Sequence, residues 1–163
     1  MIIEALFHFV SGNEKQMRAV IQRVKRASVT IENKPGKSIG EGLLILVGIG
    51  KDDTSKEIEW GAEKILNLRI FSNEEEKFDR SVLETRGDIL VISQFTLYGD
   101  PNKGRRPDFT EAARPETAQP LYEKFVELLK KSGLKVETGE FGAHMTVEIA
   151  NDGPVTLILD SAR

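Results

Sequence analysis

Two short stretches of the chain carry the residue types that could perform chemistry. The first spans residues 93–100 and opens with two small hydroxyls and one amide, in the order Ser93, Gln94, Phe95 and Thr96. The second spans residues 151–156 and contains an Asn-Asp-Gly-Pro sequence. Hydroxyl and amide side chains donate and accept hydrogen bonds, but neither stretch holds a nucleophile beside a base. The combination indicates chemistry performed by main-chain groups and by the substrate itself.

Serine-hydrolase and metal chemistry are both weakly supported. A catalytic triad would require Ser93, His144 and a distant aspartate to converge, and the residues around Ser93 do not form a Gly-x-Ser-x-Gly elbow. The chain has no cysteine and two histidines, and its aspartates are dispersed without metal-ligand spacing. We therefore expect no metal and no cofactor. Taken alone, the hydroxyls of residues 93–96 are also explained by a strand end that satisfies its own backbone.

The other candidate segments also have two explanations each. Residues 151–154 fit a hairpin turn, or else a cis Gly153–Pro154 bond that turns a carbonyl in an unusual direction. The trans form is favoured by frequency, because about 5–6% of X–Pro bonds in folded proteins are cis. Lys103, Arg105 and Arg106 suit a solvated loop, or a loop that grips phosphate beside a pocket.

The bulk composition limits the class of protein. The chain has 163 residues, of which 39% are hydrophobic and 30% charged, as expected for one globular domain. A net charge of −3 argues against nonspecific coating of nucleic acid, but not against docking of one RNA end on a local basic patch. No apolar run reaches eighteen residues, so no membrane association is expected. The absence of cysteine is compatible with a cytoplasmic location, which we predict.

Residues 1–16 differ from the rest of the chain. They are apolar at first, then polar, and lack the basic start of a secretory signal. A second methionine, Met17, follows them. We expect residues 1–16 to be either a segment upstream of a natural start at Met17 or a dispensable extension, and residues 17–163 to form the functional domain. The alternative is an additional strand packed on that domain.

Periodicity predicts the elements that position these segments. Alternating side chains predict strands over residues 20–24 and 29–31, whereas continuous apolar runs at 43–47 and 88–92 predict strands buried on both faces. Residues 145–149 and 155–159 alternate on either side of the 151–154 turn, which predicts a C-terminal hairpin.

Two amphipathic helices are expected as well. A capping box at Thr54 and Glu57 begins a helix near 55–67, and a second helix near 117–132 has Gly133 as its stop. The predicted fold is therefore a single α+β domain, with a mainly antiparallel or mixed, barrel-like β-sheet and two main helices.

Taken together and in this order, the motifs resemble the D-aminoacyl-tRNA deacylases of the bacterial and eukaryotic type. The resemblance runs from residues 17–24 to 159–160, nearly everything but the extension. Ser93–Thr96 together with Gly153–Pro154 is its most specific part. The other matching segments are residues 48–50, 64–69, 103–107 and 138–145.

The resemblance implies a homodimer whose active sites lie at the interface. The pocket for the 3′ aminoacyl end of tRNA would be lined by Ser93, Gln94, Phe95 and Thr96. Gly153 and Pro154 would reach in from the partner through a cis bond and test the chirality of the α-carbon. The remaining positions implied are Arg23, which would hold that loop, Phe141 and Met145, beside the terminal adenosine, and Ala113, in the pocket wall.

The activity implied is hydrolysis of D-aminoacyl-tRNA, with glycyl-tRNA as a further substrate and L-aminoacyl-tRNA excluded. Amides near Phe95 and Thr96 would stabilise the oxyanion, and the 2′-hydroxyl of the terminal ribose would assist the water, without a metal. A sister class that edits L-alanyl-tRNA remains an alternative, although Ala113 favours the D-specific class. A non-catalytic tRNA-binding module and a metal- or serine-dependent esterase are the others.

Overall fold

Strand β1 (Arg18–Ile31) is the centre of the fold, because it pairs antiparallel with three other strands. Its first half pairs with β3 (Gly42–Gly48), its second half pairs with β2 (Lys37–Ile39), and its other edge pairs with β8 (Met145–Asp160). The computed structural model describes residues 17–161, so the expected extension 1–16 lies outside the described residues.

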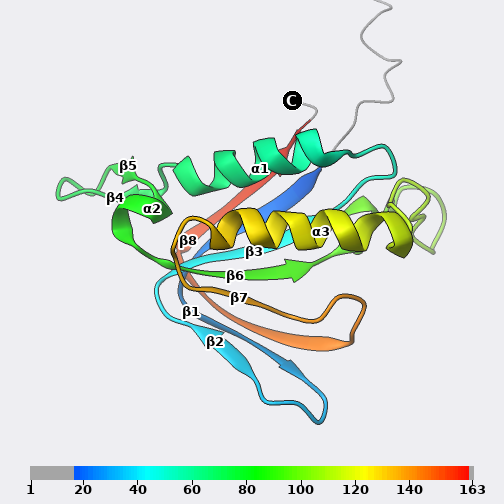
Figure 1. Ribbon diagram of the computed structural model, residues 1–163, viewed down its shortest axis with the longest axis horizontal. Coiled ribbons are helices and arrows are strands. Elements are labelled where there is room, and N and C mark those ends of the chain that lie inside the picture. The colour runs from blue at the N-terminus through cyan, green and yellow to red at the C-terminus, as the bar shows by residue number, and fades with distance from the viewer. Residues whose placement is uncertain (1–16, 162–163) are drawn as a thin grey trace, which may run out of the picture.

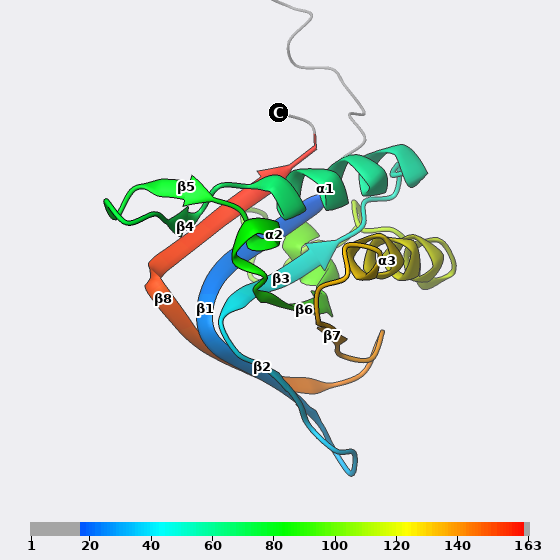
Figure 2. The ribbon, with the colours of Figure 1, turned by 60° about the vertical axis from the view of Figure 1, so that its left-hand side comes forward.

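The sheet continues from β3 by parallel pairing. β6 (Asp88–Ser93) lies beside β3, and β7 (Val136–Thr138) lies beside β6. The order is β2-β1-β3-β6-β7, with β8 on the far side of β1. Figure 2 shows that the lower part of the sheet curves inward and forms a curl. A small separate hairpin of β4 (Phe71–Ser72) and β5 (Phe78–Arg80) precedes the short helix α2 (Val82–Thr85).

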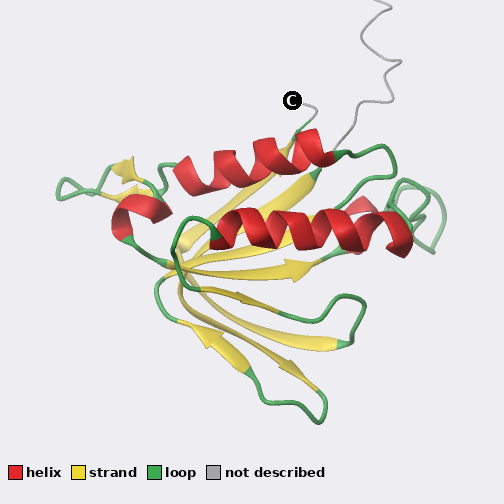
Figure 3. Ribbon diagram, in the orientation of Figure 1, coloured by secondary structure: helices red, strands yellow, loops and turns green. Residues whose placement is uncertain are grey.

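Two main helices, α1 (Ser55–Asn67) and α3 (Pro115–Lys130), lie side by side over one face of the sheet (Figures 1 and 3). The other face encloses a second, smaller apolar cluster within the curl, formed by Val24, Ala27, Val29, Ile39, Leu44, Leu90 and Ile92. The mixed, barrel-like α+β domain predicted from the sequence is confirmed. No helix of residues 17–161 is long and apolar enough to cross a membrane.

Strand β3 shows why the sheet needs two cores. Leu43 and Ile45 point into the core beneath the helices, whereas Leu44 points into the curl, and all three are fully buried. A strand with apolar neighbours on both faces requires a continuous apolar run rather than alternation. The sequence-based prediction for this strand is thus correct, as is that for β6.

The helices agree with the predicted boundaries to within two residues. Both hydrogen bonds of the α1 capping box are present, since Thr54 accepts from the first turn and Glu57 accepts from the Thr54 amide at 2.7 Å. The buried stripe of α3 is centred on Phe125 and includes Tyr122. Tyr122 tolerates burial because its hydroxyl donates to the Val91 carbonyl at 3.2 Å.

The predicted C-terminal hairpin is wrong, because residues 145–160 form one strand, β8, along the whole length of β1. The register shifts where Gln22 faces Thr156 and Val24 faces Asn151, so the turn-like residues between them form a bulge rather than a reversal. β1 is long enough to pair with both halves of β8. A turn sequence inside a continuous ladder is accommodated as a bulge that leaves the strand direction unchanged.

Gly42 is expected to be essential for the β3–β6 pair. A Cβ at Gly42 would lie 1.9 Å from the carbonyl oxygen of its partner Asp88, whereas a Cβ at Gly40 would make an ordinary 3.7 Å contact with the Asp88 carboxylate. We expect Gly42→Ala to lower the free energy of unfolding by about 2 kcal/mol or more. The matched variant Gly40→Ala should change it by less than about 0.5 kcal/mol. Urea unfolding followed by circular dichroism measures both, and equal stability of the two variants would contradict the assignment.

Candidate active site

The site begins where the parallel ladder of β6 ends. The Gln94 amide still donates to the Val47 carbonyl at 2.8 Å, and the chain then turns into a short 3₁₀ helix, η2 (Phe95–Tyr98). The sheet therefore fixes the position of residue 94, and the segment after it projects beyond the ends of β3 and β6.

Tyr98 anchors η2 to the sheet. Its ring is 5% exposed and lies over Gly48, where an added Cβ would come within 3.0 Å of the ring. The Arg18 guanidinium stacks on the ring at 4.9 Å from its centroid. Burial raises the pKa of Tyr98 well above its ordinary value, helped by the negative charge of Asp53, so the phenol stays protonated. The buried Tyr98 thus holds η2 in a fixed orientation.

The first residues of η2 present main-chain donors. A 3₁₀ helix satisfies amides from its fourth position onward, and here the Leu97 amide donates to Gln94 at 3.2 Å and the Gly99 amide to Thr96 at 2.9 Å. Within residues 17–161, the amides of Phe95 and Thr96 have no hydrogen-bond acceptor. Two adjacent free amides on a rigid turn are suited to bind a developing oxyanion.

The side chains of the tetrapeptide divide between two roles. Gln94 donates its side-chain amide to the Thr96 hydroxyl, which orders both groups at the start of η2. Phe95 is 57% exposed and projects from the turn. Its ring packs edge-on against Phe109, with the ring centroids 5.2 Å apart. An exposed aromatic ring beside free amides is an arrangement expected of a binding surface.

A cleft of about 610 Å³ opens beside η2. Three segments far apart in sequence form its walls: the end of β6 with η2, the loop before α3 together with the start of that helix, and the turn that leads into β8. The lining residues are Ile49, Ile92, Ser93, Gln94, Phe95, Phe109, Ala112, Ala113, Arg114, Pro115, Ala118, Phe141, Gly142, Ala143, His144, Met145 and Val147.

The loop before α3 is hydrogen-bonded to the end of β3. The Ala113 amide donates to the Ile49 carbonyl at 2.9 Å, and Ala112 pairs with Gly50 in an isolated bridge. Since the main chain at residue 113 is fixed, the size of its side chain helps to set the width of the cleft. An alanine there leaves the cleft open.

The opposite wall is held by aromatic and sulfur contacts. Phe141 packs against Tyr122 of α3, with the ring centroids 5.8 Å apart. Met145 accepts a hydrogen bond from the Glu140 amide at 3.4 Å and lies over Gly139, where an added Cβ would be 2.4 Å from its sulfur. These contacts position both side chains as apolar surfaces on the cleft.

The lining contains little ionisable chemistry. Arg114 and His144 are its titratable side chains, and no carboxylate belongs to it. In the described part of the chain, no group of three or more His, Asp or Glu side chains is arranged to hold a metal ion. The polar groups that this cleft offers a substrate are therefore mainly backbone donors and neutral side chains.

The 151–154 segment lies outside this cleft. The Gly153–Pro154 peptide bond is cis, both residues are exposed, and neither lines the cleft of the same chain. Asn151 closes the bulge by accepting from the Val155 amide at 2.9 Å and donating to the Thr156 hydroxyl at 2.8 Å. The segment therefore projects from the sheet as an ordered loop.

Arg23 connects this loop to the rest of the molecule. It donates from Nε to the Asp152 carbonyl at 3.3 Å and forms an ion pair with the Asp152 carboxylate at 3.2 Å. It also donates to the Ile70 carbonyl at 2.8 Å, and its guanidinium stacks on the ring of Phe78 at 5.5 Å. Arg23 thus joins β1, the β4–β5 hairpin and the loop in one polar cluster.

The structure sorts the ten residues singled out from the sequence into two places. Six line the cleft, and Thr96 adjoins it through Gln94. Arg23, Gly153 and Pro154 gather on another part of the surface. Phe109 also lines the cleft and was not predicted from the sequence, although an aromatic residue inside a charged, proline-containing loop is a usable signal.

The chain is similar to known proteins over most of its length. The family described as D-Tyr-tRNA(Tyr) deacylase matches residues 20–160. The D-aminoacyl-tRNA deacylases of Thermotoga petrophila and Thermosipho africanus are 56% and 58% identical over 147 residues, which is 90% of this chain and 99% of each relative.

Solved structures show the same fold. The c-Myc DNA unwinding element binding protein is 46% identical, with a TM-score of 0.81 over 87% of this chain and 97% of its own. A probable eukaryotic D-amino acid tRNA deacylase has a TM-score of 0.79 at 19% identity, over 89% of this chain and 99% of its own, which supports the fold alone. With a family match over most of its length and relatives above half identity, the chain belongs to the D-Tyr-tRNA(Tyr) deacylase family.

Proposed function

We propose that this protein is an enzyme that hydrolyses the ester bond of D-aminoacyl-tRNA and releases the D-amino acid and free tRNA. The observation that carries the proposal is the pair of free amides at Phe95 and Thr96, beside an apolar cleft without a carboxylate. The relatives at 56% and 58% identity are named for this activity. The reaction belongs in the cytoplasm, where aminoacyl-tRNA is used.

The mechanism follows from the chemistry of the substrate. An aminoacyl ester is already activated, so its hydrolysis needs positioned water and a stabilised oxyanion more than a strong base. Water attacks the ester carbonyl, and the amides of Phe95 and Thr96 bind the negative oxygen of the tetrahedral intermediate. The carbon–oxygen bond to the ribose then breaks, and a proton passes to the leaving oxygen through the neighbouring 2′-hydroxyl. No metal and no cofactor takes part.

The cleft also suits the rest of the acceptor end. Phe141 and Met145 offer apolar surfaces on which the terminal adenine can pack, since base faces stack on such side chains. Ala113 leaves room at the wall, which favours the D-specific class over the class that edits L-alanyl-tRNA. Free amides at a formed cleft favour an enzyme over a module that only binds tRNA.

Chiral selection requires a second copy of the chain. Gly153 and Pro154 stand exposed and outside the cleft of their own chain, and Arg23 orders the loop that carries them. In a homodimer this loop enters the partner's cleft and occupies the space that an L side chain needs. Glycine has no side chain to exclude, so glycyl-tRNA is a further substrate.

Strand β8 supplies exposed apolar side chains for that dimer. Ile158 is 72% exposed, on the face of the sheet opposite the helices, and Ile149 and Leu157 are exposed as well. β8 is also an edge strand, with pairing in residues 17–161 to β1 alone. Exposed apolar side chains beside an open edge are typical of surfaces that a second chain covers.

The decisive measurement is hydrolysis of D-tyrosyl-tRNA and L-tyrosyl-tRNA by the purified protein in the presence of a chelator. We expect the D ester to be lost rapidly and the L ester to remain at its spontaneous rate, because the loop excludes the L side chain. Loss of activity on chelation would point to a metal-dependent esterase. Cleavage of neither ester, with cleavage of L-alanyl-tRNA, would assign the chain to the sister class.

His144 is expected to be dispensable for the chemical step, because the 2′-hydroxyl replaces a side-chain base. We expect His144→Ala to retain D-tyrosyl-tRNA hydrolysis within about tenfold, whereas loss of a general base costs about 10²–10⁴-fold. A D-tyrosyl ester on a 2′-deoxy terminal adenosine should instead react roughly 10²-fold more slowly. Single-turnover rates measure both effects, and the reverse pattern would favour a serine–histidine mechanism.

Dimer formation is expected to depend on Ile158. A charge there would be buried against the partner, so Ile158→Asp should sediment at the 18.2 kDa mass of one chain and lose D-tyrosyl-tRNA hydrolysis together. Ile158→Val keeps an apolar surface and should behave as the unaltered protein, at twice that mass. Sedimentation equilibrium measures the mass, and an unaltered protein that is active as a monomer would refute the cross-subunit role of Gly153 and Pro154.

A further inference from the structure

We propose that residues 101–107, called here the basic arm, bind the phosphates of the tRNA acceptor end upstream of the terminal adenosine. The proposal rests on the proposed function for the identity of the RNA. It adds a binding surface outside the cleft, with arginine and lysine side chains as the groups that contact phosphate. Its support is the construction of the arm, the distribution of its charges and its connection to the cleft.

The arm is joined to the rest of the domain at a neck formed by Asp100 and Asp108. Asp100 and Asp108 form an antiparallel bridge, in which their amides donate to each other's carbonyls at 2.8 and 3.1 Å. The Asp100 carboxylate accepts from the amide and the side chain of Asn102, both at 2.9 Å, and these hydrogen bonds lower the pKa of Asp100. The Asp108 carboxylate accepts from the Thr110 amide at 2.8 Å. Both acids at the neck are therefore engaged locally.

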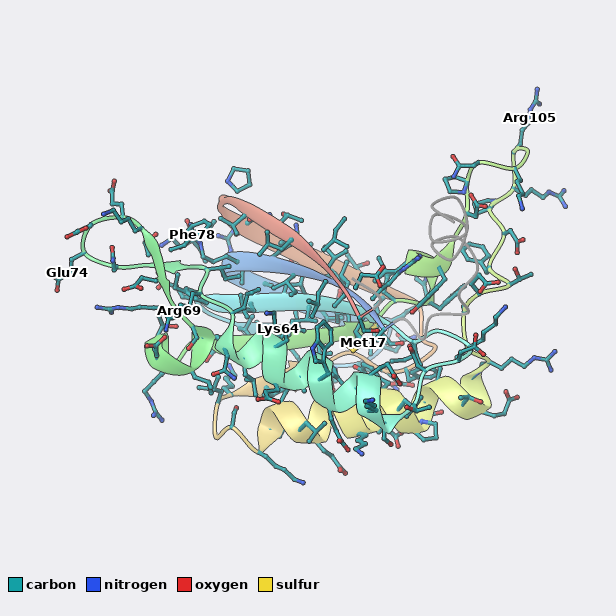
Figure 4. All side chains as sticks on the ribbon, turned by 90° about the horizontal axis from the view of Figure 1, so that it is seen from above. Met17, Lys64, Arg69, Glu74, Phe78 and Arg105 are labelled. Carbon is teal, nitrogen blue, oxygen red and sulfur yellow. The ribbon has the colours of Figure 1, made fainter. Side chains whose placement is uncertain are left out.

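The tip of the arm carries positive charge that no ion pair neutralises. Lys103, Arg105 and Arg106 are exposed, and within residues 17–161 none of them forms an ion pair. The nearby Glu111 is paired instead with Lys51 at 2.8 Å. Figure 4 shows Arg105 at the outermost point of the loop, directed away from the body. Cations that form no ion pair, in a chain of net charge −3, provide a localised anion-binding surface.

The arm is connected to the cleft through Phe109, which lines the cleft. Phe109 follows the neck directly and packs against Phe95, and Gly99 permits this approach, since an added Cβ would lie 2.8 Å from the Phe109 ring. The same segment then forms the cleft wall at residues 112–115. About three residues on each side of the tip extend at most about 10 Å beyond the neck. An RNA strand that leaves the cleft past Phe95 therefore passes within reach of the cationic tip.

The types of residue favour phosphate as the ligand. Guanidinium groups bind phosphate oxygens through two parallel hydrogen bonds, and a lysine adds a point charge. Contacts of this kind raise affinity without reading base sequence, and they weaken as salt increases. An enzyme that acts on many D-aminoacyl-tRNAs must bind RNA without depending on its base sequence.

The test compares two double variants on two substrates. Arg105→Ala/Arg106→Ala removes two charges from the arm, and Lys130→Ala/Lys131→Ala removes two exposed charges from the far end of α3, about 22 Å along the helix from Pro115. The substrates are D-tyrosyl-tRNA and 2′(3′)-O-D-tyrosyl-adenosine, which occupies the cleft but has no phosphate.

We expect the arm variant to lower kcat/KM for D-tyrosyl-tRNA at least tenfold, mainly through KM, while hydrolysis of D-tyrosyl-adenosine stays unchanged. The slope of log kcat/KM against log salt should become shallower by about 1.5, as expected for two lost phosphate contacts. The α3 variant should change neither quantity. Equal losses on both substrates would show that the arm supports the fold of the cleft, and no loss on tRNA would show that it does not contact RNA; either result overturns the proposal.

Binding of uncharged tRNA separates this proposal from the proposed function. If the unaltered protein hydrolyses neither substrate, the deacylase assignment fails, and fluorescence anisotropy with uncharged tRNA still tests the arm. A tenfold weaker affinity of the arm variant, with the α3 variant unchanged, supports the arm as an RNA-binding surface. Equal affinities of the two variants overturn it.

Discussion

The hydrogen bond from the Gln94 amide to the Val47 carbonyl is the constraint on which the site depends. It extends the β3–β6 ladder one residue past the last residue of β6, so that the turn into η2 begins at a position fixed by two largely buried strands. Tyr98, packed over Gly48, fixes the other end of the turn. Between these two anchors the amides of Phe95 and Thr96 have no acceptor within residues 17–161, and in the proposed mechanism they bind the substrate oxygen. Preorganised donors of this kind need little rearrangement during a reaction.

A second constraint explains why the 151–154 segment does not line the cleft of its own chain. β1 pairs along one edge with the full length of β8, so the Asn-Asp-Gly-Pro sequence cannot reverse the chain and projects instead as a bulge. Arg23 binds this bulge through the carbonyl and the carboxylate of Asp152. The loop is thereby rigid but remote from the cleft of its own chain. Rigidity without a local ligand suits a part that acts on another molecule, and in the proposed dimer that molecule is the partner's substrate.

In the proposed function, the cleft and the basic arm each recognise a different part of one substrate. The cleft is largely apolar and has few titratable groups, so it suits an uncharged ester and a nucleobase. The arm has exposed cations and is attached to the cleft through the packing of Phe109 on Phe95. Attraction to phosphate acts over several ångströms and needs little shape complementarity, whereas discrimination between D and L side chains needs contact at fixed positions. Separate segments of the fold can therefore serve these two requirements.

The sequence by itself determined the elements whose signals are local. The apolar run of β3 predicted a strand buried on both faces, and the capping box at Thr54 predicted the start of α1, because each depends on neighbours within a few residues. The residues Ser93–Thr96 were also recognisable, since their types and order match a known family. The membership of Phe109 in the cleft was not, because it depends on a ring contact with Phe95, fourteen positions earlier.

Only the tertiary structure decided the role of residues 145–160 and the grouping of the site. Alternation on both sides of a turn sequence is compatible with a hairpin or with one bulged strand. The bulged strand forms because β1 is long enough to pair with both halves of β8. In the same way, Arg23 lies 129 positions from Asp152, yet the β1–β8 pairing brings their side chains to 3.2 Å. Such contacts depend on long-range pairing, because the register of two paired strands fixes which residues of the two strands are neighbours. That information is distributed over the whole ladder and is absent from any single segment.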